Sequence, residues 1–180
     1  MKVIRHALLV PAMALVAGAA CADERSAALV AAFQESCITE PPNFARIEAR
    51  AIAANLPVNI DAGTPRQPEG PFNHLKSWIV ALATGSYELS AAEARGPAGE
   101  VTACAITAAD AHGEEVKQDL MKALNLGPVE RERVSPDGVR RSAWHVKIQD
   151  ETVILLLIDA TPTNAPGAYM NITHRLVAGS

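Results

Sequence analysis

The sequence is poor in aromatic residues and in basic charge. Of its 180 residues, 49% are hydrophobic but only 4% are aromatic, and alanine fills the gap with about 34 residues. Alanine adds little buried area, so the core is thinner than the hydrophobic fraction suggests. A net charge of −4 argues against a nucleic-acid-binding surface, which would need a basic excess. The length allows one domain or two small ones, and the charged fraction of 20% argues against disorder.

The motifs of the common enzyme classes are also absent. The chain has neither the G-x-S-x-G elbow of serine hydrolases nor the glycine patterns that bind dinucleotides and nucleoside triphosphates. Its histidines form no pair at metal-ligand spacing. Paired carboxylates for glycoside hydrolysis meet in space rather than in sequence, and nothing here selects such a pair. We therefore assign no catalytic, cofactor-binding or metal-binding residue, and no cofactor.

The first 22 residues have the pattern of a secretory signal peptide. Lys2 and Arg5 form a basic start, an uncharged run follows from Ala7 to Ala20, and Ala20-Cys21-Ala22 offers an A-x-A cleavage site. The alternative is a buried N-terminal helix. The uncharged run is too short to span a bilayer comfortably, and the order of charges and cleavage residues favours a signal.

Cleavage after Ala22 leaves residues 23–180 as a single α+β domain with a net charge of −6, because Lys2 and Arg5 are lost and no acidic residue is. Cys21 leaves lipidation open as an alternative, although a lipoprotein signal usually has Leu three residues before the cysteine, where this chain has Gly18. We expect a periplasmic or secreted protein, or an outer-membrane lipoprotein if Cys21 is retained and lipidated. No later segment reaches the ~18 apolar residues of a membrane span.

Two cysteines follow the expected signal, Cys37 and Cys104. Export places them in an oxidising compartment, where two otherwise unpaired thiols tend to form a disulfide. The C-x-x-C spacing of a redox pair is absent. We therefore predict a structural disulfide between Cys37 and Cys104 that closes a long loop. The alternative is two buried free thiols.

Apolar periodicity predicts about three helices packed on an antiparallel sheet of five or six strands, in the order α-αβββ-αβββ. Asn43 and Asp110 are the expected N-caps of the second and third helices, Asn55-Leu56-Pro57 ends the second, and Gly127-Pro128 stops the third. Turns are expected at Gly85-Ser86 and at Pro136-Asp137-Gly138. The predicted helices are 24–37, 44–54 and 111–125, and the predicted strands are 76–84, 87–91, 101–108, 142–148, 152–160 and 168–176.

Two further patterns concern the sheet. The unbroken apolar run Val153–Ile158 predicts a central strand covered on both faces. The segment Asn55-Leu56-Pro57-Val58 resembles Asn125-Leu126-Gly127-Pro128-Val129, and each follows a predicted helix and precedes a strand that contains tryptophan. This repeat indicates a weak internal duplication, or a chance match between alanine-rich segments.

Basic residues cluster around the segment that precedes the fourth predicted strand. Glu130, Glu132 and Asp137 lie among them in the sequence. One interpretation is a solvated loop of mixed charge, and the other is a contact surface for an acidic partner. The Pro- and Gly-rich loop over 59–75 is a second candidate surface. The basic cluster consists of Arg131, Arg133, Arg140, Arg141 and Lys147.

Several short segments resemble a family of small exported proteins of Gram-negative bacteria, some of them described as lipoproteins. The resemblance covers most of the expected mature chain and implies an envelope location and a Cys–Cys pairing. The family has no assigned activity, so no catalytic residue is transferred from it. The segments are Phe33-Gln34-Glu35-Ser36-Cys37, Lys76-Ser77-Trp78, Thr102-Ala103-Cys104, Leu124-Asn125-Leu126-Gly127 and Trp144.

These observations favour a non-enzymatic interaction or binding module of the cell envelope, with another envelope protein as its expected partner and no nucleic acid. The alternatives are a hydrolase whose site assembles only in space, and a structural component tethered by lipid. The sequence indicates no oligomeric state.

Overall fold

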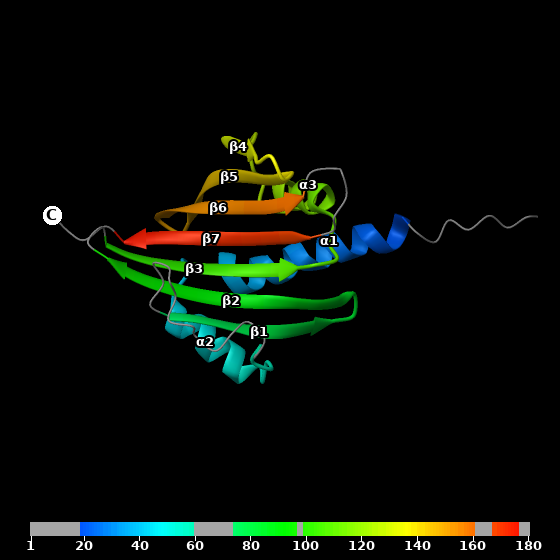
Figure 1. Ribbon diagram of the computed structural model, residues 1–180. Helices are drawn as coiled ribbons and strands as arrows, with labels where there is room; N and C mark the ends of the chain where they lie inside the picture. Colours follow the sequence, from blue (N-terminus) through cyan, green and yellow to red (C-terminus); the bar gives the residue numbers. More distant parts are fainter. Residues whose placement is uncertain (1–18, 60–73, 97–98, 161–166, 177–180) are drawn as a thin grey trace, which may run out of the picture.

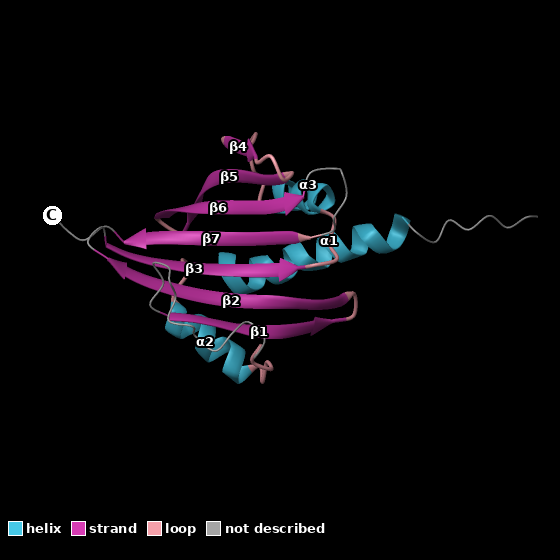
Figure 2. Cartoon of the chain, viewed as in Figure 1, coloured by secondary structure: helices cyan, strands magenta, loops and turns pink. Residues whose placement is uncertain are grey.

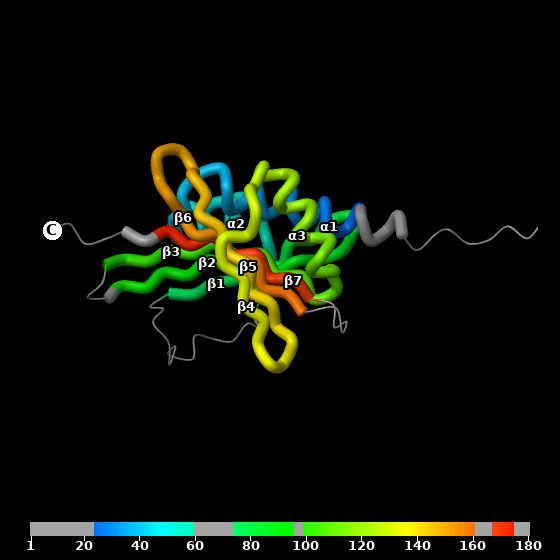
Figure 3. Tube along the Cα trace, turned by 90° about the horizontal axis from the view of Figure 1, so that it is seen from above, coloured from blue at the N-terminus to red at the C-terminus, as the bar shows by residue number. Residues whose placement is uncertain are grey.

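Seven antiparallel strands form one sheet, and the helices lie on one of its faces (Figures 1 and 3). The computed structural model describes residues 19–59, 74–96, 99–160 and 167–176. Residues 1–18 of the expected signal peptide and residues 60–73 of the expected loop lie outside this part of the chain. The helical elements are α1 (Ala19–Phe33), its π-helical continuation η1 (Gln34–Ile38), α2 (Phe44–Ala53) and α3 (Gly113–Ala123).

Two β-meanders build the sheet, and they join through β3 and β7 in the order β1-β2-β3-β7-β6-β5-β4. The predicted α+β class is confirmed, with seven strands rather than five or six. Figure 2 shows the strands as one layer with the helices behind it. The strands are β1 (His74–Leu82), β2 (Gly85–Gly96), β3 (Gly99–Ala108), β4 (Arg131–Val134), β5 (Val139–Ile148), β6 (Glu151–Ala160) and β7 (Ala168–Leu176).

The strand that the sequence did not predict is β4, with the sequence Arg-Glu-Arg-Val. Its side chains are all exposed, so it carries no apolar alternation from which a strand could be inferred. The expected turn at Pro136-Asp137-Gly138 is confirmed, because Ser135 and Val139 close a hairpin around it between β4 and β5. The expected turn at Gly85-Ser86 is wrong by two residues. Gly85 already pairs with Leu82, and the two residues between them form the turn.

The starts of α2 and α3 differ in how they are capped. Asn43 caps α2 as predicted, and its Oδ1 accepts a hydrogen bond of 3.0 Å from the backbone N–H of Arg46. Asp110 does not cap α3. Instead, His112 occupies the N-cap position without a side-chain cap bond, and the carboxylate of Asp110 binds Arg25 at 2.6 Å. A buried cation competes for this carboxylate more effectively than a backbone N–H does.

Both α2 and α3 end in the same way. Asn55 and Asn125 adopt left-handed backbone conformations with φ of 51° and 49°. The next residue then bonds back into the last helical turn, Leu56 to Ala51 at 3.0 Å and Leu126 to Met121 at 2.8 Å. Asn125, not Gly127-Pro128, therefore stops α3. The repeat noted in the sequence, between residues 55–58 and 125–129, therefore corresponds to a helix ending that α2 and α3 share.

The core lies between the sheet and the helices. Leu29 and Phe33 of α1 are fully buried in this core. Each meander contributes one tryptophan, Trp78 from β1 and Trp144 from β5, with 1% and 2% of their surface exposed. Cys37 and Cys104 form the predicted disulfide, with Cα atoms 5.5 Å apart, and it joins η1 to β3. The disulfide thus links the end of the first helix to the strand at which the two meanders meet.

The prediction of a strand covered on both faces is wrong for β6. This strand lies inside the sheet, between β7 and β5, and its residues Val153, Leu155 and Leu157 are buried beneath the helices. Ile154 points to the other face and is 47% exposed. The apolar run therefore supplies the core on one side and an exposed surface on the other.

Candidate functional site

The sheet face that no described helix covers is here called the open face. Side chains alternate between the two faces along each strand, so residues that sit opposite each other in the register share a face. Arg133 pairs with Arg141, and Arg131 pairs with Ala143. Because Ser142 and Trp144 of β5 are buried on the helix side, their odd-numbered neighbours occupy the open face. The basic strip, as we define it, consists of Arg131, Arg133, Arg141 and Lys147.

The alternation separates charges that are mixed in the sequence. Glu132 lies between Arg131 and Arg133 but turns to the helix side, where it accepts hydrogen bonds from Lys117 at 2.7 Å and Ser142 at 2.9 Å. The hydrogen bond from Lys117 lowers the pKa of Glu132 below its usual range. Folding thus removes one of the acidic residues that dilute the cluster in the sequence.

Arg140 does not belong to the strip. It lies on the helix side, where its guanidinium binds the fully buried carboxylate of Asp159 and reaches Glu114 of α3 at 2.7 Å. The bond to Asp159 raises the pKa of Arg140, and the bond from Arg140 lowers that of Glu114. Gly113 is required here, because a Cβ at this position would lie 2.2 Å from the side chain of Asp159. Arg140 therefore docks α3 onto the sheet.

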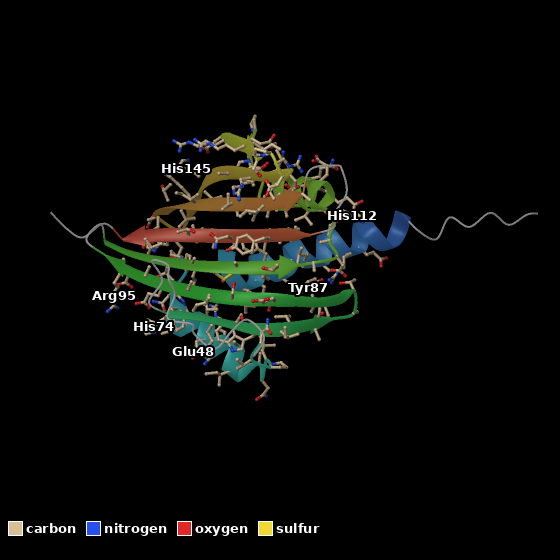
Figure 4. The ribbon with its side chains drawn as sticks, viewed as in Figure 1. Glu48, His74, Tyr87, Arg95, His112 and His145 are labelled. Atoms are coloured by element: carbon tan, nitrogen blue, oxygen red, sulfur yellow. A yellow bond between two sulfur atoms is a disulfide. The ribbon has the colours of Figure 1, made fainter. Side chains whose placement is uncertain are left out.

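Among the described residues, the four cations of the strip form no direct ion pair, but the positive charges of Arg131 and Arg141 contribute to the lowered pKa values of the exposed carboxyls of Glu130 and Asp137. Glu130, next to Arg131, binds His145 at 2.5 Å and also accepts from its backbone N–H at 3.1 Å. The hydrogen bond from His145 lowers the pKa of Glu130. In Figure 4, His145 lies beside the β4–β5 hairpin, at the opposite edge of the sheet from His74 and Glu48. The strip is thus a locally basic surface along β4 and β5 of an acidic protein.

An apolar row runs beside the basic strip. It consists of Ile154, Leu156 and Ile158 on β6, the strand next to β5. Leu156 and Ile158 also line a shallow hollow of about 430 Å³ that extends across β7 to Val101 and Ala103 of β3. The small side chains of β3 leave room for this hollow, since alanine fills less of the surface than leucine or isoleucine would.

The hollow also contains a short polar ladder on β7. Asn171 donates to the hydroxyl of Tyr169 at 3.1 Å, and Thr173 donates to the amide oxygen of Asn171 at 2.6 Å. Burial raises the pKa of Tyr169, so its phenol stays protonated and neutral around pH 7. The floor of the hollow is therefore uncharged, with fixed hydrogen-bonding groups beside apolar walls.

Other chemistry-bearing residues form structural pairs. His174 binds Glu151 at 2.5 Å, and Ser26 of α1 binds Asp119 of α3 at 2.5 Å. The described residues contain no group of three or more His, Cys, Asp or Glu side chains arranged to hold a metal ion. Nor do they include a helix with the length and apolarity that a bilayer crossing requires.

The fold and the open face are interpreted from the sequence and the structure. No family model, curated protein or solved structure matches the chain.

Two features of the open face were not predicted from the sequence. The apolar row belongs to the run Val153–Ile158, for which the sequence predicts a strand covered on both faces, because an unbroken apolar run is typical of such strands. The placement of Arg131 and Arg133 on one face and Glu132 on the other depended on strand β4, which the sequence does not predict. Alternation from Trp144 alone could have placed Arg140 opposite Arg141, because tryptophan marks the buried side of β5.

Proposed function

We propose that this protein is an exported, non-enzymatic binding module of the cell envelope, and that it receives an acidic partner protein on its open face. Export is supported by the signal-peptide pattern of the first 22 residues. The Cys37–Cys104 disulfide is consistent with it, because such bonds persist in oxidising compartments. The resemblance to small exported proteins of Gram-negative bacteria points to the same location.

The observation that carries the proposal is the separation of Arg131 and Arg133 from Glu132. It places Arg131 and Arg133 on the same face as Arg141 and Lys147 of β5, beside an apolar row whose Ile154 is 47% exposed, on a chain whose overall charge is negative. Exposed apolar surface rimmed by charge is typical of protein interfaces. Complementary charge steers association and fixes orientation, so an acidic partner suits this face.

A charged edge strand has a second role, because short, charged edges discourage sheets from pairing edge to edge. That role accounts for charges on β4 alone. It does not account for Arg141 and Lys147 on β5 or for Ile154 on β6, which lie inside the sheet. The combination of strip, row and hollow favours a binding face.

Site-specific cross-linking tests the proposal. A photoreactive residue at Arg133 should capture an acidic envelope protein in cells, and one at Lys122, an exposed position on α3, should not. The captured protein is then purified, and Arg133→Glu should weaken its binding by about tenfold. Lys122→Glu makes the same change in net charge and should alter binding by less than about twofold. Equal capture at both positions, or a basic partner, would refute the proposal.

The mass of the N-terminal residue distinguishes a cleaved periplasmic or secreted protein from an outer-membrane lipoprotein. Cleavage after Ala22 gives a free Asp23 N-terminus, whereas lipidation leaves Cys21 as the first residue with a large added mass. A chain that retains Met1 in the cell would contradict export altogether.

A further inference from the structure

A groove of about 510 Å³ lies between α1 and α2, on the helix side of the sheet. Ten of its thirteen lining residues are apolar. Ala31 and Ala32 line one wall from α1, Ala51 and Ala54 line the other from α2, and Leu89 of β2 lies at the floor. Because alanine side chains are short, the two helices leave the space between them unfilled. The volume falls within the ~300–1,000 Å³ that is usual for small-molecule pockets.

The polar residues of this groove gather where α1 passes through η1 toward α2. They are Glu35, Ser36 and Arg50. Away from them, the groove is lined by alanine and aliphatic side chains, including Leu82 of β1, which is 41% exposed. The groove therefore has one polar end and an apolar length, and a uniformly apolar or uniformly polar ligand would leave part of it unmatched.

Arg50 at the polar end is loosely held. Its guanidinium lies 3.5 Å from Glu40 and 3.3 Å from the hydroxyl of Thr39. Glu40 is engaged more closely by Arg46, which also donates to the carbonyl of Pro41 at 2.8 Å. Arg50 can therefore give its donors to an anion without breaking a strong ion pair. The carboxylate of Glu35, on the facing wall, suits a cation beside that anion.

The frame around the groove is fixed on both sides. The disulfide Cys37–Cys104 anchors the α1 wall to β3 just beyond Ser36. On the α2 wall, Glu48 binds Lys76 of β1 at 2.6 Å. A ligand would thus meet a preformed groove and would not have to order the helices, which keeps the entropic cost of binding low.

From these contacts we propose that the groove binds a single-chain phospholipid. The acyl chain would lie along the alanine walls over Leu89, the phosphate would bind Arg50, and an ammonium in the head group would face Glu35. The transfer of the chain from water to the apolar walls supplies the affinity. The two opposite charges at one end select a zwitterionic head. This site lies on the other face of the sheet from the proposed protein-binding surface and is independent of it.

Titration of the purified, delipidated, oxidised protein with palmitoyl lysophosphatidylethanolamine tests the proposal. Saturable binding is expected at lipid concentrations below micelle formation. It should be tighter than binding of palmitate, which lacks the ammonium and meets Glu35 as a like charge. No saturable binding, or tighter binding of palmitate, would overturn the assignment.

A matched pair of variants locates the chain. Ala31 and Ala27 are both exposed on α1, one turn apart, but only Ala31 lines the groove. Ala31→Phe should fill the groove and weaken lipid binding by at least about tenfold, and Ala27→Phe should change it by less than about twofold. Thermal unfolding of both variants checks that each is folded. Equal losses, or no loss in Ala31→Phe, would place the lipid elsewhere.

A second pair locates the head group. Arg50→Gln should weaken the lysophospholipid about fivefold and leave binding of the uncharged probe N-phenylnaphthylamine unchanged, because only the phosphate needs the guanidinium. Lys122→Gln, on α3, should affect neither ligand. If Arg50→Gln weakens both ligands alike, the head group does not lie at Arg50 and the proposed orientation is wrong.

Discussion

The two faces of the sheet are built from alternate residues of the same strands, yet they differ in how their charges are treated. On the helix side, Arg140 is neutralised by Asp159 and Glu114, and Glu132 is neutralised by Lys117. On the open face, the cations of the basic strip are left without such partners among the described residues. Burial demands paired charges, whereas a solvated face tolerates unpaired ones. The charges packed between the helices and the sheet are therefore paired, and the cations of the strip remain exposed.

The largest effect should come from the disulfide, which belongs entirely to the helix side. Its cysteines are 67 residues apart, and the chain-entropy model gives about 4 kcal/mol for closing such a loop. We expect the double variant Cys37→Ser/Cys104→Ser to lose roughly 2–5 kcal/mol of unfolding free energy in urea titrations. The control is the native protein under reducing conditions, which should lose a similar amount. A loss below about 1 kcal/mol in both would show that the helices hold to the sheet without it.

Neighbouring residues of β6 compare the two faces directly. Leu155 is fully buried beneath the helices, and Ile154 is 47% exposed on the open face. Leu155→Ala should cost about 3 kcal/mol of unfolding free energy, because it leaves a cavity in the core. Ile154→Ala should cost less than about 1 kcal/mol, since no closed cavity forms there. Equal costs measured by urea titration would mean that the open face is as tightly packed as the core.

The smallest effect concerns acidification. Ion pairing with Arg25 lowers the pKa of Asp110, and ion pairing with Arg140 lowers that of Glu114. A carboxylate whose folded-state pKa is depressed adds stability above its unfolded pKa of about 4, and this stability is lost as the pH falls through the folded value. Both side chains are well exposed, so each should contribute less than about 1 kcal/mol.

Unfolding titrations at neutral and acidic pH measure this effect. The free energy of unfolding should fall on acidification, and Asp110→Asn should reduce the fall by removing one of the titrating groups. On the open face, Arg133→Gln removes no titrating carboxylate and should leave the pH profile unchanged. A profile that is identical in the native protein and in Asp110→Asn would show that the pairing with Arg25 adds no stability.

Local patterns predicted most of the fold, and non-local competition explains what they missed. The cap at Asn43, the helix predicted over 24–37 and the pairing of Cys37 with Cys104 each followed from a short segment or from simple counting. The fate of Asp110 depended on Arg25, which lies 85 residues away in the sequence, so no local rule could have placed it. The ion pair of Arg140 likewise depended on Asp159, on the next strand.

The candidate surfaces were less predictable than the fold. The basic cluster was found, but the placement of Arg131 and Arg133 on the open face required the register of β4 with β5. The groove between α1 and α2 left no signal that could be separated from ordinary helix packing, because alanine favours a helix whether or not a space lies beside it. The space beside the short alanine side chains is seen only when the positions of both helices are known.

The joining of the two meanders through β7 has a consequence for the timing of folding. This strand is the last of the seven to be synthesised, yet it lies between β3 and β6 in the middle of the sheet. Until it emerges, the two meanders have no hydrogen-bonded connection, and pairing across a long loop is slow. A nascent chain would therefore remain incompletely folded for most of its synthesis. That delay would suit the proposed export, in which the polypeptide stays extended while it is threaded through a membrane and the disulfide forms only on the far side.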